Sequence, residues 1–179
     1  DAHGALPKLE CDNSATRGLM VQNHENINQQ YLHPNGPTSG ARPEAEAIKE
    51  IEAHGVSVTE YRDTGNLAWT VVVDGTFNRR ITPNTPVSFT GPVAGSALLR
   101  TVFASNGLAG RGTLNNCANG HTPWATNLTC EENWAGYFKR GVGDNANRSA
   151  REITQLNRYG IPQGAGGSYG WSPVVTSTA

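Results

Sequence analysis

Two segments of the sequence concentrate residue types that bind metal ions. The shorter is the run Asn23-His24-Glu25-Asn26. The longer extends from Gly112 to Trp134 and holds two thiols, an imidazole and two adjacent carboxylates: Cys117, Cys130, His121, Glu131 and Glu132. Carboxylate oxygens alone suit calcium or magnesium, whereas a thiolate combined with carboxylates and imidazole suits iron or zinc. A metal site therefore explains both segments economically, although these residue types do not specify a reaction.

Glu25 stands where an apolar run gives way to polar residues. Residues 18–22 predict a short buried strand. A carboxylate at a strand end is held by a rigid element and points beyond the sheet edge. We therefore take Glu25 as a candidate metal ligand. The alternative is an exposed turn in which His24 has no role.

The adjacent residues Glu131 and Glu132 cannot both face one site from a regular strand. Successive side chains of a strand point to opposite faces of its sheet. Unless the strand bulges or ends there, we expect one of these carboxylates to face the site and the other to bond elsewhere.

The three cysteines are Cys11, Cys117 and Cys130, and an odd number cannot all pair within the chain. Neither Cys117 nor Cys130 belongs to a Cys-x2-Cys pair, so their spacing is not a zinc-binding pattern. A Cys117–Cys130 disulfide between neighbouring strands is the alternative to a metal-binding thiol.

The elements that must position these residues are mainly strands. Residues 56–61 and 67–73 predict a β-hairpin, and turn signals separate further short strands. A short helix is predicted after Pro43, with Ala47, Ile48 and Ile51 as its apolar stripe and Gly55 ending it. Residues 144–160 can form a second short helix, and residues 172–179 read as a tail. We therefore predict a mainly β fold with one convincing helix on a connecting segment.

Charge and hydropathy exclude several classes of function. The chain has 179 residues, with 14 Lys and Arg against 15 Asp and Glu. This balance lacks the basic footprint expected of a protein that binds nucleic acid. No apolar run approaches the roughly 18 residues of a membrane-spanning helix. We therefore expect neither a nucleic-acid partner nor a membrane span.

The longer segment resembles the signature stretch of the PhoX-type alkaline phosphatases. The matching motifs are Thr113-Leu114-Asn115-Asn116-Cys117-Ala118, Thr122-Pro123-Trp124 and Leu128-Thr129-Cys130-Glu131-Glu132-Asn133. Further matching stretches occur in the family's order: Asn23-His24-Glu25, Leu32-His33-Pro34-Asn35-Gly36, Ala53-His54-Gly55-Val56-Ser57-Val58, Arg79-Arg80-Ile81-Thr82 and Gly91-Pro92-Val93-Ala94-Gly95. The resemblance covers roughly residues 17–171.

This resemblance implies a periplasmic or extracellular phosphomonoesterase built on a β-propeller. It also implies a cluster of iron and calcium ions held by carboxylates and a cysteine. The implied metal ligands are Glu25, Glu131 or Glu132, and one thiol. We favour Cys117 because it precedes a turn containing glycine, and Cys130 is the alternative.

Members of that family are several hundred residues long. We therefore expect residues 1–171 to form the N-terminal part of a PhoX-like propeller, about one to two blades, with residues 172–179 as a tail or a truncated continuation. On this reading the chain is a fragment that lacks part of the site. The alternative is a non-catalytic secreted β module that binds metal or self-associates through unpaired strand edges.

Overall fold

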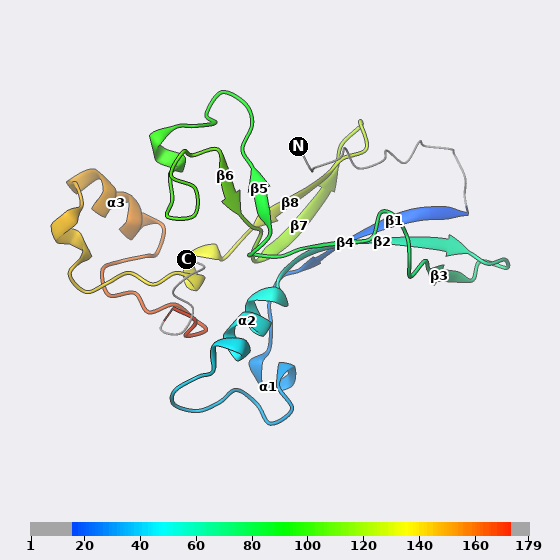
Figure 1. The fold of residues 1–179 in the computed structure, drawn as a ribbon, viewed down its shortest axis with the longest axis horizontal. Coiled ribbons are helices and arrows are strands. Elements are labelled where there is room, and N and C mark those ends of the chain that lie inside the picture. The colour runs from blue at the N-terminus through cyan, green and yellow to red at the C-terminus, as the bar shows by residue number, and fades with distance from the viewer. Residues whose placement is uncertain (1–15, 173–179) are drawn as a thin grey trace.

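The computed structural model describes residues 16–172, and its elements are mainly strands (Figure 1). The strands are β1 (Arg17–His24), β2 (Gly55–Asp63), β3 (Trp69–Val71), β4 (Arg79–Ile81), β5 (Pro86–Ser88), β6 (Ala109–Arg111), β7 (Asn116–His121) and β8 (Asn127–Glu131). The α-helices are α1 (Gln29–Leu32), α2 (Glu44–Glu52) and α3 (Ala150–Arg158). Three 3-10 turns cover Ala97–Leu99, Trp134–Tyr137 and Asp144–Asn147. The mainly β class is confirmed, and the described residues contain three α-helices where one convincing helix and a possible second are predicted.

The largest sheet is organised around β2. Strand β1 pairs antiparallel with β2 along its whole length, from Arg17 opposite Arg62 to His24 opposite Gly55. The other edge of β2 is shared by β3 and β4, which pair with different parts of it. The hairpin predicted over residues 56–73 is therefore present as β2 and β3.

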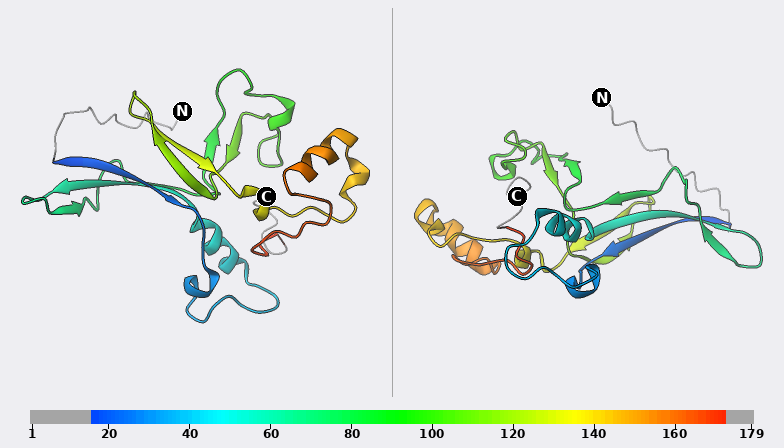
Figure 2. Two further views of the ribbon diagram at one scale, coloured as in Figure 1. Left: turned by 180° about the vertical axis from the view of Figure 1, so that it is seen from behind. Right: turned by 60° about the horizontal axis from the view of Figure 1, so that its bottom comes forward.

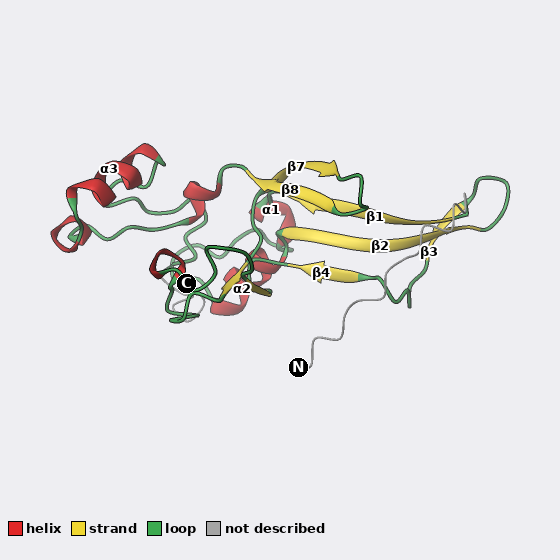
Figure 3. Cartoon of the chain, turned by 90° about the horizontal axis from the view of Figure 1, so that it is seen from above, coloured by secondary structure: helices red, strands yellow, loops and turns green. Residues whose placement is uncertain are grey.

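Two smaller sheets accompany it: β5 pairs with β6 and β7 pairs with β8. The β7–β8 hairpin lies beside the end of β1 (Figures 1 and 3). Asn23 joins the two sheets, because its Nδ2 donates to the carbonyl oxygen of Cys117 at 2.9 Å while its Oδ1 accepts from Thr129 Oγ1 at 2.9 Å. These bonds connect residues about a hundred positions apart in the sequence.

Helix α2 begins after Pro43, as predicted, and buries Ala47 and Ile51 against Trp171. Acidic residues in its first turn interact favourably with the helix dipole. Ile48, which belongs to the predicted apolar stripe, is exposed instead of buried. The guanidinium of Arg80 donates to the carbonyl oxygens at the end of the helix, on residues 52–54.

A buried carboxylate, Glu50, connects α2 to distant parts of the chain. It is fully buried and accepts from His33 Nε2 at 2.8 Å, from Trp171 Nε1 at 2.7 Å and from Gln29 Nε2 at 2.9 Å, and it also pairs with Arg42. A buried charge needs such partners, because removing it from water is costly. The Trp171 contact attaches the C-terminal end of the described chain to α2.

Helix α3 lies away from the large sheet, as two further views show (Figure 2). Ser149 and Glu152 form a capping box at its start, and none of its residues is buried. Helix α3 lies within residues 144–160, where the sequence allows a second short helix. Of the predicted tail at 172–179, only Ser172 lies within the described residues. No helix among the described residues is long and apolar enough to cross a membrane.

Candidate metal centre

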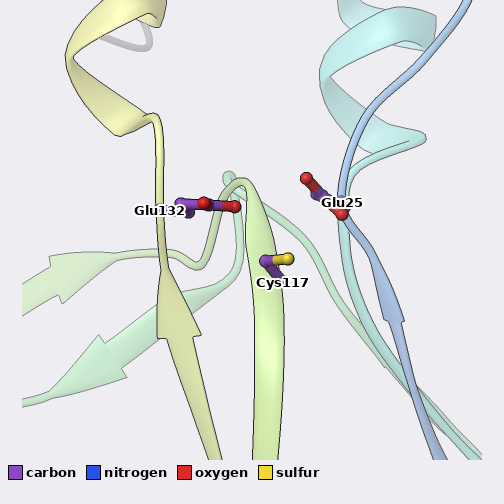
Figure 4. A group of neighbouring side chains, drawn as sticks. All are labelled: Glu25, Cys117 and Glu132. Carbon is purple, nitrogen blue, oxygen red and sulfur yellow. The ribbon is translucent and has the colours of Figure 1, made fainter.

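Glu25, Cys117 and Glu132 come together from three separate segments. Their potential ligand atoms, one oxygen from each carboxylate and the thiol sulfur, all lie within 4.8 Å of one another. Glu25 follows β1, Cys117 lies on β7 and Glu132 follows β8 (Figure 4). In that view the sulfur and the two carboxylates point into the same space. We call these three residues the donor group.

The end of β1 determines the position of Glu25. The ladder to β2 stops at the pair of His24 and Gly55. Glu25 is the next residue, half-buried, where the chain leaves the sheet. This is the strand-end position that the sequence predicts for it.

Cys117 lies in a β-bulge. Asn116 is opposite Glu131 and Asn119 is opposite Thr129, so β7 has one more residue than β8 between these pairs. A bulge bends its strand and changes the direction of a side chain. Here the irregular stretch contains Cys117, whose exposed thiol faces the two carboxylates.

The two adjacent glutamates have different surroundings. Glu131 ends β8, and its Oε1 accepts from Thr113 Oγ1 at 2.8 Å and from the amide nitrogen of Leu114 at 3.0 Å. Glu132 belongs to the donor group. Glu132 thus faces the site while Glu131 supports the loop before β7; β8 ends at Glu131, which is the strand-end case that the sequence left open. Among the predicted ligands, Glu131 is the one that this geometry does not bring to the group.

The charges of the donor group favour a bound cation. Hydrogen bonds to the carboxylates of Glu132 and Glu25 raise the pKa of the Cys117 thiol to about 11. The same carboxylates would repel a thiolate, and a neighbouring positive charge would favour the ionised thiol. One soft and two hard donors within a few ångströms match iron with a cysteine ligand, and the carboxylates also suit calcium. The residues present therefore fit the implied metals.

The other candidates from the sequence lie elsewhere. Cys130 is exposed and outside the donor group, and both it and Cys117 are free thiols, so the alternative disulfide is not formed. His121 is exposed at the end of β7. His24 bonds Ser57 Oγ through Nε2 at 2.9 Å, and burial together with the nearby Arg80 lowers its pKa. Cys11 lies outside the described residues.

A second acidic cluster, His33, Glu46 and Glu50, has suitable spacing for a metal but different chemistry. The guanidinium of Arg42 already pairs with both of its carboxylates. A cation at the same oxygens would compete with this charge. We therefore interpret the cluster as a structural ion-pair network.

Sequence reasoning missed Asn115, which lies between the carboxylate-bearing segments. Its side chain is buried, and its φ of 53° is in the left-handed region, which asparagine tolerates better than most residues. The available signal was the pair Asn115-Asn116 directly before Cys117.

Comparison with known proteins now identifies the family. The family model of the alkaline phosphatase PhoX matches residues 2–176. The chain belongs to the PhoX alkaline phosphatase family. This confirms the resemblance seen in the motifs around Glu25 and Cys117.

A solved member of the PhoX family has the same fold over this region. It is Pseudomonas fluorescens PhoX in complex with vanadate, a transition state analogue, which is 35% identical in sequence with a TM-score of 0.75. The match covers 92% of this chain and 27% of that chain. The curated proteins compared with this chain gave no match.

Proposed function

We propose that this chain is part of a metal-dependent phosphomonoesterase and that Glu25, Cys117 and Glu132 bind its iron. The observation that carries the proposal is the convergence of these donors from three distant segments in a member of the PhoX family. Calcium is the second proposed metal, because carboxylates are its preferred side-chain ligands. Glu131 is proposed to support the centre by holding the loop at residues 113–114.

The protein residues have distinct proposed roles. A bound cation of this kind would polarise phosphoryl oxygens and stabilise the leaving alkoxide. The carboxylates of Glu25 and Glu132 supply the negative charge that retains it, and the thiolate of Cys117 favours iron over harder cations. The thiol lies in the irregular stretch of β7 and faces both carboxylates.

The substrate proposed is a phosphomonoester. The solved PhoX binds vanadate, described as a transition state analogue, which supports phosphoryl transfer as the reaction in this family. We further propose a periplasmic or extracellular location, the location implied by the family.

The proposed site extends beyond these residues. The chain spans 27% of the solved PhoX, so the rest of a PhoX-like protein would supply further ligands and phosphate-binding groups. On this proposal the three sheets are parts of one to two blades of a propeller, with residues 1–171 as its N-terminal part.

Metal binding by the purified chain tests this proposal. Co²⁺ is the probe, because a cobalt–thiolate bond gives a charge-transfer absorption band. We expect a band that is lost in Cys117→Ser and retained in Cys130→Ser. Glu132→Gln should weaken Co²⁺ binding, whereas Glu131→Gln, which keeps the Oε1 acceptor for Thr113 and Leu114, should weaken it much less. The iron content of the purified chain and its hydrolysis of p-nitrophenyl phosphate are measured as well.

Each result has a clear meaning. A Cys117-dependent band with little hydrolysis supports an incomplete PhoX site, and iron binding with turnover supports a site that this chain completes. A chain that binds no metal through Cys117 contradicts the proposed function. If such a chain also forms ordered oligomers, the non-catalytic β module becomes the better interpretation.

A further inference from the structure

Asn115 bonds to both of the segments that carry the carboxylates of the donor group. Its Nδ2 donates to the backbone carbonyl oxygen of Glu25 at 3.0 Å. Its Oδ1 accepts from the amide nitrogen of Asn133 at 2.5 Å, and its own carbonyl oxygen accepts from the amide nitrogen of Glu132 at 3.1 Å. One residue therefore connects the end of β1 to the end of β8, two positions before Cys117.

The surrounding groups leave the amide of Asn115 only one orientation. The carbonyl oxygen of Glu25 only accepts, and the amide nitrogen of Asn133 only donates. Rotating the side-chain amide by half a turn would place donor against donor and acceptor against acceptor. The hydroxyl of Tyr137 accepts from the second Nδ2 hydrogen at 3.1 Å, so three of the four hydrogen-bonding positions of the amide are used.

Burial makes these bonds hard to replace. Asn115 is only 3% exposed, so water cannot readily substitute for a lost partner. None of its side-chain bonds ends on a candidate metal-binding atom, because they go to the backbone of Glu25 and Asn133 and to the hydroxyl of Tyr137. Asn115 can thus influence the position of the carboxylates without being a ligand.

We propose that Asn115 is a positioning residue, which holds the backbones of Glu25 and Glu132 at metal-binding separation before the ion arrives. The proposal rests on the metal site proposed above. Without an ion the two carboxylates repel each other. Neutral backbone hydrogen bonds oppose this separation without adding charge. Groups that orient metal ligands in this way typically change metal affinity about 10–100-fold when they are altered.

The test compares Asn115→Asp with a matched asparagine elsewhere. Aspartate keeps the size of the side chain, its tolerance of a positive φ and an acceptor for the amide nitrogen of Asn133, but it removes the donor to Glu25. Asn115→Ala removes both side-chain links. The control is Asn78→Ala, because Asn78 likewise binds backbone at both ends of its amide, on Val72, Val73 and Glu60, and none of these is a donor residue.

Two quantities are measured on the full chain: the affinity for Co²⁺, from its thiolate charge-transfer band, and the stability of the metal-free protein in urea. We expect affinity to fall about 10–100-fold in Asn115→Asp, and at least as far in Asn115→Ala. Asn78→Ala should lose stability yet bind Co²⁺ like the wild type. The position of the band should also shift in Asn115→Asp, because the ligands are held differently.

The outcomes separate this proposal from the one on which it rests. If the wild type shows a Cys117-dependent band and Asn115→Asp binds Co²⁺ equally well, the positioning role is wrong and the metal site stands. If both asparagine variants weaken binding only in proportion to lost stability, Asn115 is structural and the proposal is overturned. If the wild type shows no such band, both proposals fail.

Discussion

At the scale of single residues, His54 shows how the chain buries a titratable group. It is fully buried, with its ring 5.2–5.8 Å from the rings of Tyr137, Tyr169 and Trp171. Its Nδ1 lies 2.8 Å from the carbonyl oxygen of Glu50, so this nitrogen carries the proton. Its Nε2 has no hydrogen-bond partner among the described residues. The environment therefore suits a neutral imidazole.

The pKa of His54 predicts how stability depends on pH. Burial lowers this pKa below its ordinary value of 6.5, and the charge of Arg80 lowers it further, although Glu50 opposes the shift. The unfolded chain therefore binds a proton at His54 at a higher pH than the folded chain does. We expect the stability to be fully present above about pH 6.5 and to fall as the pH drops from 6.5 toward the lower folded-state pKa.

Urea denaturation of the metal-free chain between pH 5 and 7.5 measures this effect. His54→Asn removes the titrating group and keeps an N–H donor for the carbonyl of Glu50, so its stability should vary less with pH than that of the wild type. His24, whose pKa is also lowered, accounts for part of the remaining dependence. Equal pH dependence in the variant and the wild type would show that His54 is not the responsible group.

At the scale of elements, the junction of β1 and β2 determines where Glu25 leaves the sheet. Gly55 begins β2, pairs with His24 and has a φ of 107°. A Cβ at this position would collide with the backbone oxygen of Ile81 on β4. Glycine is thus required at position 55 both for its positive φ and for the close approach of β2 and β4.

Gly65 provides a matched control for a substitution at Gly55. It has nearly the same φ, 108°, but open space where its Cβ would lie. We expect Gly65→Ala to lose about 1–2 kcal/mol from backbone strain alone. Gly55→Ala should lose a further ~1–3 kcal/mol from the steric conflict with β4.

Unfolding in urea measures both losses, and Co²⁺ titration adds a second readout. Only Gly55→Ala should also weaken metal binding, because it moves the end of β1 next to Glu25. Equal losses of stability in the two variants would show that β4 can move away from the added Cβ at Gly55 without a loss of stability.

At the scale of the whole molecule, the proposed metal centre is a link between sheets. The described residues form sheets of four, two and two strands, and the buried apolar cluster contains only Ala47 and Ile51 with Trp171 packed against them. Polar side chains also join segments that are distant in the sequence. Asn23 and Asn115 join the end of β1 to the β7–β8 hairpin, where the donor group lies.

A metal bound at this junction should stabilise the whole fold. An ion that binds only the folded chain, at a hundred times its dissociation constant, adds about 2.7 kcal/mol to the free energy of unfolding. We expect Co²⁺ to produce such an increase in urea denaturation and a chelator to reverse it. The combined variant Glu25→Gln, Cys117→Ser and Glu132→Gln should gain much less. Equal stabilisation of this variant would place the bound ion elsewhere.

Much of the local structure and the chemistry of the centre could be predicted from the sequence. The apolar run before Glu25 predicted a strand end, although none of residues 18–22 is buried as predicted. The sequence also predicted that Glu131 and Glu132 would face one site together only if the strand bulged or ended there, and β8 ends at Glu131. These features depend on neighbouring residues, whose periodicity is visible in one dimension. Helices α1 and α3 were harder to predict than α2, because α1 is a single turn and α3 has no buried face.

Only the tertiary structure decided which residues meet. Glu25 lies beside Cys117 and Glu132 because β1 packs next to β7, a contact between segments far apart in the sequence. Cys117 lies in the irregular stretch of β7, and a shift of one residue in a strand reverses the direction of every side chain. The sequence by itself therefore determined the kinds of donors and the family, whereas strand register and long-range packing selected the donors that meet.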